Sequence, residues 1–405
     1  MSENESITMT EGPAAPPSYT RIFFAGITGD GALDYIDQSG ENGGFNSAPT
    51  RLSTLTFQPQ HLNISLTQDG YLGVLAINAA GGTPTYIHEN REASASTRFS
   101  APLDLGLPSG VSTCLDTAMV NGVTGRLNVF LTSGDADNAI WWRFQNPNTV
   151  TEETLTVVPP GTETPVEITV PVEQPPTQLW GDWLQLPGAL CQITTTQTGD
   201  NRILLAGINV AGSAYLTLQS SERPLVPEGW LAWQDISGGL TGFEQLLCAT
   251  DGTALVHIFA RIGTSIYMRV QDSVGSPSFS DWVLFATFPD AVGDMAVALS
   301  SVGGLYLVAQ VGSGPGCPVY AKYQLGQGGP EWSTPQVIAQ LSGDSTLALQ
   351  ANANTALSLF ALDLGTGAAS TLTQQSLAHW GIAWSGLAGS YATIAVKQDV
   401  TPNPS

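Results

Sequence analysis

The sequence predicts an all-β fold, a seven-bladed β-propeller with four-stranded blades whose ring is closed by pairing of N- and C-terminal strands. Three observations predict it. An alternating apolar strand recurs seven times, further short strands follow each copy after a turn, and the two chain ends carry complementary parts of one unit. Composition agrees, because the 405 residues are 42% hydrophobic and include 44 glycines and 26 prolines, enough for a core and many turns.

The recurring strand has an apolar residue at its second position in every copy. These residues lie 50 to 55 positions apart, except for one interval of 76. They are Ile22, Leu72, Leu127, Ile203, Leu255, Leu305 and Leu357. A unit of about 50 residues with several short strands has the size of one propeller blade.

Two further elements follow the recurring strand in each unit. The first reads aromatic-x-polar-x-Gln in its best forms, which begin at Trp141, Tyr215, Tyr267 and Tyr320. The second opens with an aromatic residue in every unit, namely Phe45, Phe99, Trp180, Trp230, Phe279, Trp332 and Trp380. In three units another Trp follows three positions later, at Trp183, Trp233 and Trp282. With a less regular strand, each unit therefore holds four strands.

We expect residues 20–398 to form the ring, residues 1–19 to be a flexible leader and residues 399–405 to be a tail. Residues 21–38 look like the second half of a unit whose first half lies in residues 380–398. These two segments should therefore pair in one sheet, which removes both free sheet edges.

The long interval contains an insertion at residues 148–177, between the second and third full units. Two alternating runs flank a tip rich in Pro and Gly, which predicts a protruding β-ribbon. Its apolar stripe comprises Leu155, Val157, Ile168 and Val170. A lone two-stranded ribbon is marginally stable in water. We therefore expect the stripe to be buried, and favour a homo-oligomer contact through residues 148–177 over packing on the same ring.

Charge excludes several classes of partner. The chain has 12 Lys and Arg against 34 Asp and Glu, a net charge of −22, so it lacks the basic residues that bind nucleic acid or anionic lipid. The sequence shows no signal peptide and no apolar run near the ~20 residues of a membrane-spanning helix. We expect no nucleic-acid partner, no membrane insertion and cytoplasmic synthesis, with release by a non-standard route left open.

Metal and cofactor sites are not expected. Four cysteines lie 57 to 77 residues apart without a CxxC pair, which argues against zinc and disulfides and favours buried thiols. They are Cys114, Cys191, Cys248 and Cys317. The segment from Asp135 to Asn138 begins like a calcium loop but lacks the later Gly and Glu, so it indicates a polar turn.

The sequence gives little support for an enzyme. It contains no nucleophile elbow, phosphate-binding loop, dinucleotide fingerprint or sialidase-type box. Its four histidines lie in different units, and His257 falls within an apolar strand, as core histidines do. We predict no catalytic activity. A carboxylate pair assembled by the fold is the alternative that sequence leaves open.

Aromatic and polar side chains recur together at the blade period, for example Trp141 with Arg143 and Tyr267 with Arg269. An aromatic platform beside a few polar groups is typical of sugar sites. The candidate ligand-binding residues are Trp141, Arg143, Trp183, Tyr215, Trp233, Tyr267, Arg269 and Trp282. The alternative is that these periodic aromatics only fill the space between blades.

Three segments carry a resemblance to a known family. The run Trp230-Leu-Ala-Trp-Gln, the strand Ala254-Leu-Val-His-Ile-Phe and the segment Asp137-Asn-Ala-Ile-Trp141-Trp-Arg143 resemble blade motifs of the Photorhabdus-type seven-bladed propeller lectins. The resemblance covers residues 20–398 as architecture, and residues 99–147 and 180–285 at the level of motifs.

This resemblance implies pockets between neighbouring blades for fucose-like or methylated sugars. The units near 45–98 and 332–375 depart from the family pattern because they lack the paired Trp. We expect a non-catalytic carbohydrate-binding lectin whose partners are glycans or glycoconjugates. The alternatives are a protein-interaction propeller that serves as the recognition part of a toxin or surface assembly, and an enzyme whose residues one sequence does not reveal.

Overall fold

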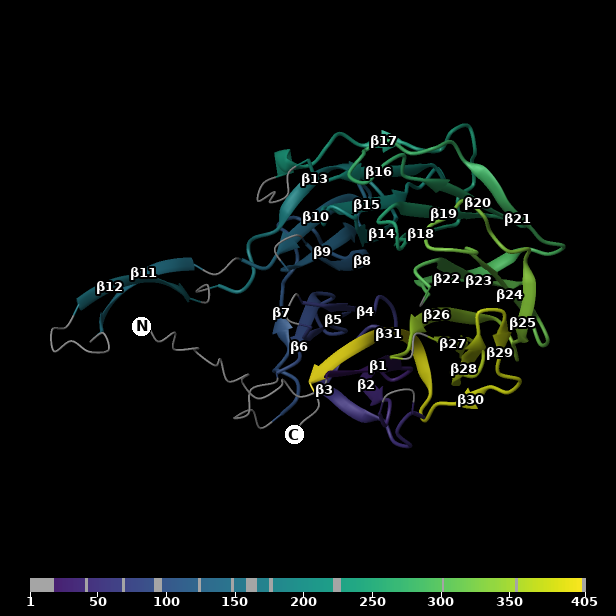
Figure 1. The fold of residues 1–405 in the computed structure, drawn as a ribbon, viewed down its shortest axis with the longest axis horizontal. Coiled ribbons are helices and arrows are strands. Elements are labelled where there is room, and N and C mark those ends of the chain that lie inside the picture. Colours follow the sequence, from purple (N-terminus) through teal and green to yellow (C-terminus); the bar gives the residue numbers. More distant parts are fainter. Residues whose placement is uncertain are drawn as a thin grey trace, which may run out of the picture.

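The computed structural model describes residues 18–40, 43–67, 70–90, 97–122, 125–146, 149–157, 166–174, 178–220, 227–300, 302–353 and 356–402. These residues form seven antiparallel four-stranded sheets that stand as blades around a ring, and one separate two-stranded ribbon (Figure 1). The prediction of an all-β, seven-bladed propeller is confirmed. Within the described ranges the helical structure is one 3-10 turn, η1 (Pro227–Gly229), and no helix is long and apolar enough to cross a membrane.

The blades are numbered here in chain order, and their strands are given from the innermost outward. Blade 1 contains β31 (Tyr391–Pro402), β1 (Ser18–Thr28), β2 (Ala32–Asp37) and β3 (Thr50–Thr56). Blade 2 contains β4 (Asn63–Leu66), β5 (Leu72–Ile77), β6 (Pro84–His88) and β7 (Leu103–Asp104). Blade 3 contains β8 (Cys114–Asn121), β9 (Leu127–Ser133), β10 (Ala139–Phe144) and β13 (Leu184–Ala189).

The remaining blades follow the same order. Blade 4 contains β14 (Gln192–Gln197), β15 (Ile203–Ile208), β16 (Ala214–Leu218) and β17 (Gln234–Asp235). Blade 5 contains β18 (Gln245–Thr250), β19 (Val256–Ile262), β20 (Ser265–Val270) and β21 (Val283–Thr287). Blade 6 contains β22 (Val292–Leu299), β23 (Leu305–Val311), β24 (Pro318–Tyr323) and β25 (Gln336–Gln340). Blade 7 contains β26 (Ser345–Ala351), β27 (Leu357–Asp363), β28 (Ala369–Ser376) and β29 (His379–Trp380), with β30 (Ser385–Gly386) also paired to β28.

The core lies between the blades. The second strand of each blade is covered on both faces, and every residue of β5, β9 and β15 is buried. A strand buried on both faces needs a continuous apolar run, and this is the recurring pattern of the sequence. The apolar clusters combine neighbouring blades; Phe23 of blade 1, for example, packs in one cluster with Val74 of blade 2. The blades are therefore held together by side-chain packing across each seam.

A glutamine or glutamate at the end of the third strand closes every blade internally. Its side-chain oxygen accepts a hydrogen bond of 2.6 to 3.3 Å from an amide of the second strand. The donor is the first residue of that strand in blades 2 to 7, and Ile22 within β1 in blade 1. The seven acceptors are Gln38, Glu89, Gln145, Gln219, Gln271, Gln324 and Gln374. Each also pairs in a β-bridge with the aromatic residue that opens the next element. The recurring Gln thus positions the fourth strand.

The ring closes through the two chain ends, as predicted, but with different bounds. The N-terminal β1 pairs along its length with the C-terminal β31, from Ser18 opposite Pro402 to Thr28 opposite Tyr391 (Figure 1). Trp380 does not belong to this blade, because it bridges Gln374 within blade 7. The C-terminal segment therefore contributes one strand and the N-terminal segment three, where the sequence suggested two halves.

The strands of the ring also reach past the predicted limits of 20 and 398. Ser18 and Pro402, which face each other at one end of the β1–β31 pair, fall in the segments predicted as the leader and the tail. Residues 1–17 and 403–405 lie outside the described residues. Asp399, which was placed in the tail, is fully buried.

The insertion forms a ribbon of two strands, β11 (Thr149–Val157) and β12 (Val166–Gln174), paired over nine residues. Figure 1 shows it standing out from the ring. It connects β10 to β13 and so interrupts blade 3, whereas the sequence placed it between two units. The tip of the ribbon lies outside the described residues. The side chains of its apolar stripe, Leu155, Val157, Ile168 and Val170, are not described either, so their burial stays a prediction.

Candidate functional site

The structure brings Arg143 and Trp183 together at the seam between blades 2 and 3. The guanidinium lies 5.5 Å from the centroid of the Trp183 ring, and its Nε donates to Gly181 O at 2.6 Å. Another guanidinium nitrogen donates to Leu105 O of blade 2, and Trp183 Nε1 donates to the same oxygen at 3.2 Å. We call this arrangement a latch, because an Arg–Trp pair from one blade binds a carbonyl just after the outer strand of the preceding blade.

The same latch recurs at the seam between blades 4 and 5. Arg269 lies 5.3 Å from the centroid of the Trp282 ring, and both side chains donate to Ile236 O of blade 4. Arg269 Nε also donates to Ser280 O at 2.8 Å. Burial lowers the pKa of both latch arginines from the ordinary value, and nearby aspartates only partly offset this. Backbone carbonyls accept from two guanidinium nitrogens of Arg143 and from all three of Arg269, so these arginines hold blades together.

Two other seams carry reduced versions of the latch. At the seam between blades 5 and 6, the Lys322 ammonium lies 4.0 Å from the centroid of Phe285 and donates to the carbonyl of that residue. At the seam between blades 6 and 7, Trp384 Nε1 donates to Gln340 O at 3.0 Å without a basic partner. The recurrence at successive seams indicates a structural role for this set of aromatic and basic residues.

The predicted residues Trp141, Tyr215 and Tyr267 begin the third-strand motif of their blades and are half-buried. Tyr215 packs against the cluster that contains Trp142 and Trp230, and Tyr267 packs against the cluster of blades 4 and 5. Trp141 Nε1 is buried and has no hydrogen-bond partner among the described residues. The eight candidates therefore do not form one site; they are distributed over three consecutive blades.

The seam between blades 3 and 4 contains a cavity, whereas an arginine covers the Trp at each of the two neighbouring seams. Trp233 Nε1 donates to Pro187 O of blade 3, as in a latch, but Thr217 stands where blades 3, 5 and 6 have Arg or Lys. A cavity of about 400 Å³ remains there. Its lining consists of Leu186, Pro187, Thr217, Glu228, Trp230, Leu231, Ala232 and Trp233. Of the predicted residues, Trp233 lines this cavity.

A second cavity, of about 760 Å³, lies at the seam between blades 7 and 1. No charged side chain is among the described residues that line it. Its side-chain polar groups belong to Gln38, Asn46, Ser47, Asn352, Thr371, Thr373 and Ser385, and Phe45 contributes an aromatic ring. Thr371 Oγ1 is buried there without a hydrogen-bond partner in the described residues. Sequence reasoning missed this cavity because its residues come from segments more than 300 positions apart.

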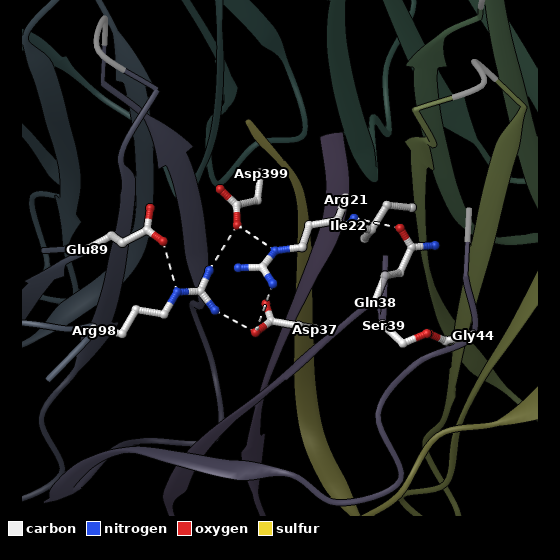
Figure 2. A network of polar contacts seen from close by, with 9 residues as sticks. All are labelled: Arg21, Ile22, Asp37, Gln38, Ser39, Gly44, Glu89, Arg98 and Asp399. Atoms are coloured by element: carbon white, nitrogen blue, oxygen red, sulfur yellow. Dashed lines mark hydrogen bonds and ion pairs between the residues drawn. The ribbon is translucent and has the colours of Figure 1, made fainter. Parts of the chain in front are cut away.

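The seam between blades 1 and 2 is held by buried charges. Figure 2 shows Arg98 of blade 2 reaching Glu89 at 2.8 Å, Asp37 at 2.5 Å and Asp399 at 2.9 Å. Arg21 also donates to Asp399, at 3.1 Å. Burial opposes the charge on Arg98, but hydrogen bonds and attraction from Asp37 and Glu89 outweigh it and raise its pKa above the usual range. The sequence carries one sign of this charged seam. Glu89 is the one acid among the seven residues at the recurring Gln position.

A third cavity, of about 800 Å³, lies between blades 5, 6 and 7 and is lined by several acidic residues. Asp290, Asp294 and Asp344 all line it. Burial raises the pKa of Asp294. Both of its oxygens are occupied, one by Gln245 Nε2 of blade 5 at 2.6 Å and the other by Leu347 N of blade 7 at 2.7 Å. Asp294 therefore ties three blades together.

The histidines and cysteines are engaged in local contacts. His257 is buried and its Nε2 lies 2.9 Å from Asp251, while Nδ1 lacks a partner in the described chain. His61 pairs with Asp116 at 3.1 Å. All four cysteines are free thiols; Cys317 is buried and the others are half-buried. Across the residues that the structure describes, no group of three or more His, Cys, Asp or Glu could hold a metal ion.

No family model matches the chain, and no curated protein matches it. Solved structures do match. The periplasmic gluconolactonase of Pseudomonas aeruginosa has a TM-score of 0.54 and 11% identity, over 95% of this chain and 99% of that one. An ulvan lyase from a polysaccharide lyase family has a TM-score of 0.50 and 10% identity, over 84% and 87%. AofleA from Arthrobotrys oligospora has a TM-score of 0.47 and 7% identity, over 86% and 91%. At these identities the likeness supports the propeller fold alone.

Proposed function

We propose that this propeller is a non-catalytic lectin that binds sugars in pockets between its blades. The observation that carries the proposal is the cavity at the seam between blades 3 and 4. Trp233, Thr217 and Glu228 line this space of about 400 Å³ together with apolar side chains. A sugar presents apolar C–H faces and fixed hydroxyls, which an aromatic wall and a few polar groups complement. Fucose-like sugars, in which a methyl group replaces the hydroxymethyl group, and methylated sugars both suit such a wall.

The cavity between blades 7 and 1 supports the same function. Its lining is rich in hydroxyl and amide groups, and an uncharged polyhydroxyl ligand can exchange hydrogen bonds with them. Thr371 Oγ1, buried and unpartnered among the described residues, would gain a hydrogen bond from such a ligand. Two pockets on one rigid ring also allow weak sites to add their affinities on a glycan-bearing surface.

The absence of catalysis is also part of the proposal. A glycosidase needs one carboxylic acid and one carboxylate free to act on either side of the scissile bond. Asp294 has a raised pKa, but protein donors occupy both of its oxygens. The Asp251 carboxylate, likewise, accepts from Thr253 and pairs with the buried His257. These groups serve contacts within and between blades, and that favours binding without turnover.

A glycan array tests the proposal. Purified protein should bind a defined set of glycans, whereas a protein-interaction propeller should bind none. Val210 is exposed on blade 4, the blade that carries Trp233. The control variant Val210→Ala should bind the same set of glycans as the original protein. Failure of the folded protein to bind any glycan would overturn the lectin, and release of aryl aglycone from aryl glycosides would overturn the absence of catalysis.

A further inference from the structure

In blade 4, Thr217 occupies the position that an arginine occupies in blades 3 and 5. The equivalent hydrogen bonds of these residues establish the correspondence. In blades 3 and 5 the arginine Nε donates to the carbonyl of the residue that directly follows the bridging aromatic: Gly181 after Trp180, and Ser280 after Phe279. In blade 4 the Thr217 hydroxyl donates to the equivalent carbonyl, that of Leu231 after Trp230, at 2.7 Å. Thr217 therefore makes the same hydrogen bond within its own blade as the arginine Nε, and it makes none of the other latch contacts.

The rest of the arginine has no counterpart in blade 4. In blades 3 and 5 the guanidinium covers a Trp ring and donates to the preceding blade, at Leu105 O or Ile236 O. The Thr217 side chain is too short to do either. The unfilled space is the cavity beside Trp233, bounded by Leu186 and Pro187 of the preceding blade. We call this space, lined by Thr217, Glu228, Trp230 and Trp233, the cation slot.

We propose that the cation slot binds an organic cation, a guanidinium or alkylammonium group that occupies the position of the missing arginine head. Two other seams of the same molecule show a guanidinium on an equivalent Trp. The slot adds an exposed carboxylate, Glu228, and none of the described residues lining it is basic. The electrons of an aromatic face attract a cation that lies over the ring. The net charge of −22 also raises the local concentration of cations.

The identity of the ligand rests on the proposed lectin function. A sugar that meets these requirements is an amino sugar, whose protonated amine lies on Trp233 near Glu228 while its ring faces the apolar wall. This names a substrate class for one pocket. The uncharged pocket between blades 7 and 1 offers no carboxylate to such an amine among its described residues, so it should not prefer amino sugars over neutral ones.

Nuclear magnetic resonance of Trp indole groups tests the slot. In protein labelled with ¹⁵N-tryptophan, the Trp233 Nε1–H signal is assigned with Trp233→Phe. Titration with n-butylguanidinium should shift this signal, and the affinity should fall as salt increases, because salt screens the attraction. Titration with n-butanol, of similar length and without charge, should not shift it. No shift with n-butylguanidinium would overturn the slot.

Two reciprocal variants give the matched control. Thr217→Arg supplies the missing head from the protein itself, so it should lose at least tenfold in n-butylguanidinium affinity and melt at a higher temperature. Arg269→Thr opens an equivalent slot between blades 4 and 5, so n-butylguanidinium should now also shift the Trp282 signal. Unchanged affinity in Thr217→Arg, or a folded Arg269→Thr protein whose Trp282 signal does not respond, would overturn the slot.

Sugar titrations separate this inference from the lectin. Glucosamine oligomers should shift the Trp233 signal, and glucose oligomers of equal length should do so much less. If n-butylguanidinium binds and no amino sugar does, the amino-sugar ligand is overturned. If neutral sugars shift the Trp233 signal and cations do not, the slot is overturned and the lectin stands.

Discussion

The seam between blades 1 and 2 and the seam between blades 4 and 5 are held by different contacts. At the first, Arg98 binds carboxylates from the strands at both chain ends and from its own blade. At the second, Arg269 donates to backbone carbonyls and covers Trp282. The first is a unique contact where the chain ends meet, and the second belongs to a repeated pattern.

The difference has an energetic consequence. Removing one partner of a buried ion pair leaves an uncompensated charge, which costs about 3–5 kcal/mol. Removing a donor to backbone carbonyls costs about 1–3 kcal/mol, because the carbonyls are left without that donor. The closing seam should therefore be the more sensitive of the two, and its sensitivity should depend on pH.

Deletion of residues 1–40 should have the largest effect, because it removes β1 and β2 and opens the ring. The remaining chain would expose a long apolar edge along β31 and should not fold in soluble form. A circular permutant that joins the two ends by a short linker and opens the turn at Gly263–Thr264 keeps every strand and should fold. Soluble, monomeric protein with a cooperative melting transition after the deletion would contradict the ring closure.

Arg98→Met should lower the free energy of unfolding by about 3–5 kcal/mol at neutral pH. Asp37, Glu89 and Asp399 would lose the cation that binds all three, and the three carboxylates would repel one another. This repulsion weakens as the pH falls and acid neutralises carboxylates, so the deficit should shrink toward pH 5. Arg98 itself adds no pH dependence there, because its raised pKa keeps it charged. Denaturant unfolding from pH 5 to 8 measures this, and a deficit constant with pH would contradict it.

Arg269→Met should have a smaller effect, a loss of about 1–3 kcal/mol in the free energy of unfolding. Burial lowers the pKa of Arg269, but the ordinary value for arginine is above about 12, so it stays protonated through the same pH range. The loss should therefore be the same at pH 5 and pH 8. A deficit that varies with pH as that of Arg98→Met does would remove the distinction between the two seams.

Replacing residues 150–176 with a short Gly/Ser linker should change stability least. The ribbon stands out from the ring in Figure 1, so the melting temperature should stay nearly constant. The mass measured by light scattering should fall if the ribbon joins two copies of the chain, as we propose. An unchanged mass with a melting temperature lower by several degrees would mean that the ribbon packs on its own ring.

The fold followed from the sequence because the second strand of each blade must be apolar on both faces, and this produces one long-period signal. The bounds of the closing blade did not follow. Trp380 resembles the start of a new unit, but its bridge to Gln374 makes it the end of blade 7. Three of the recurring Gln or Glu acceptors were also missed, since Gln38, Glu89 and Gln374 do not follow the aromatic-x-polar-x-Gln form.

The site was harder to predict, because its chemistry depends on contacts with the preceding blade. The pairing of aromatic and basic residues was visible in the sequence, but the carbonyl that Arg143 binds lies 38 positions away, at Leu105. The role of Thr217 becomes visible only when its position is compared with those of Arg143 and Arg269 in the neighbouring blades. Glu228 lies outside the periodic pattern altogether. Four of the eight predicted ligand-binding residues, Arg143, Trp183, Arg269 and Trp282, are therefore parts of latches, and Trp233 lines a cavity.

The most direct test compares Trp233→Ala with Trp282→Ala. Both indoles donate to a carbonyl of the preceding blade, but Trp233 lines a cavity whereas Trp282 is covered by Arg269. Glycan binding and melting temperature should be measured for both, with binding assayed well below the melting temperatures. We predict that Trp233→Ala loses sugar binding at its seam while staying folded, and that Trp282→Ala keeps sugar binding and melts at a lower temperature. A folded Trp233→Ala protein with the full glycan-binding pattern and affinity of the original chain would contradict the account.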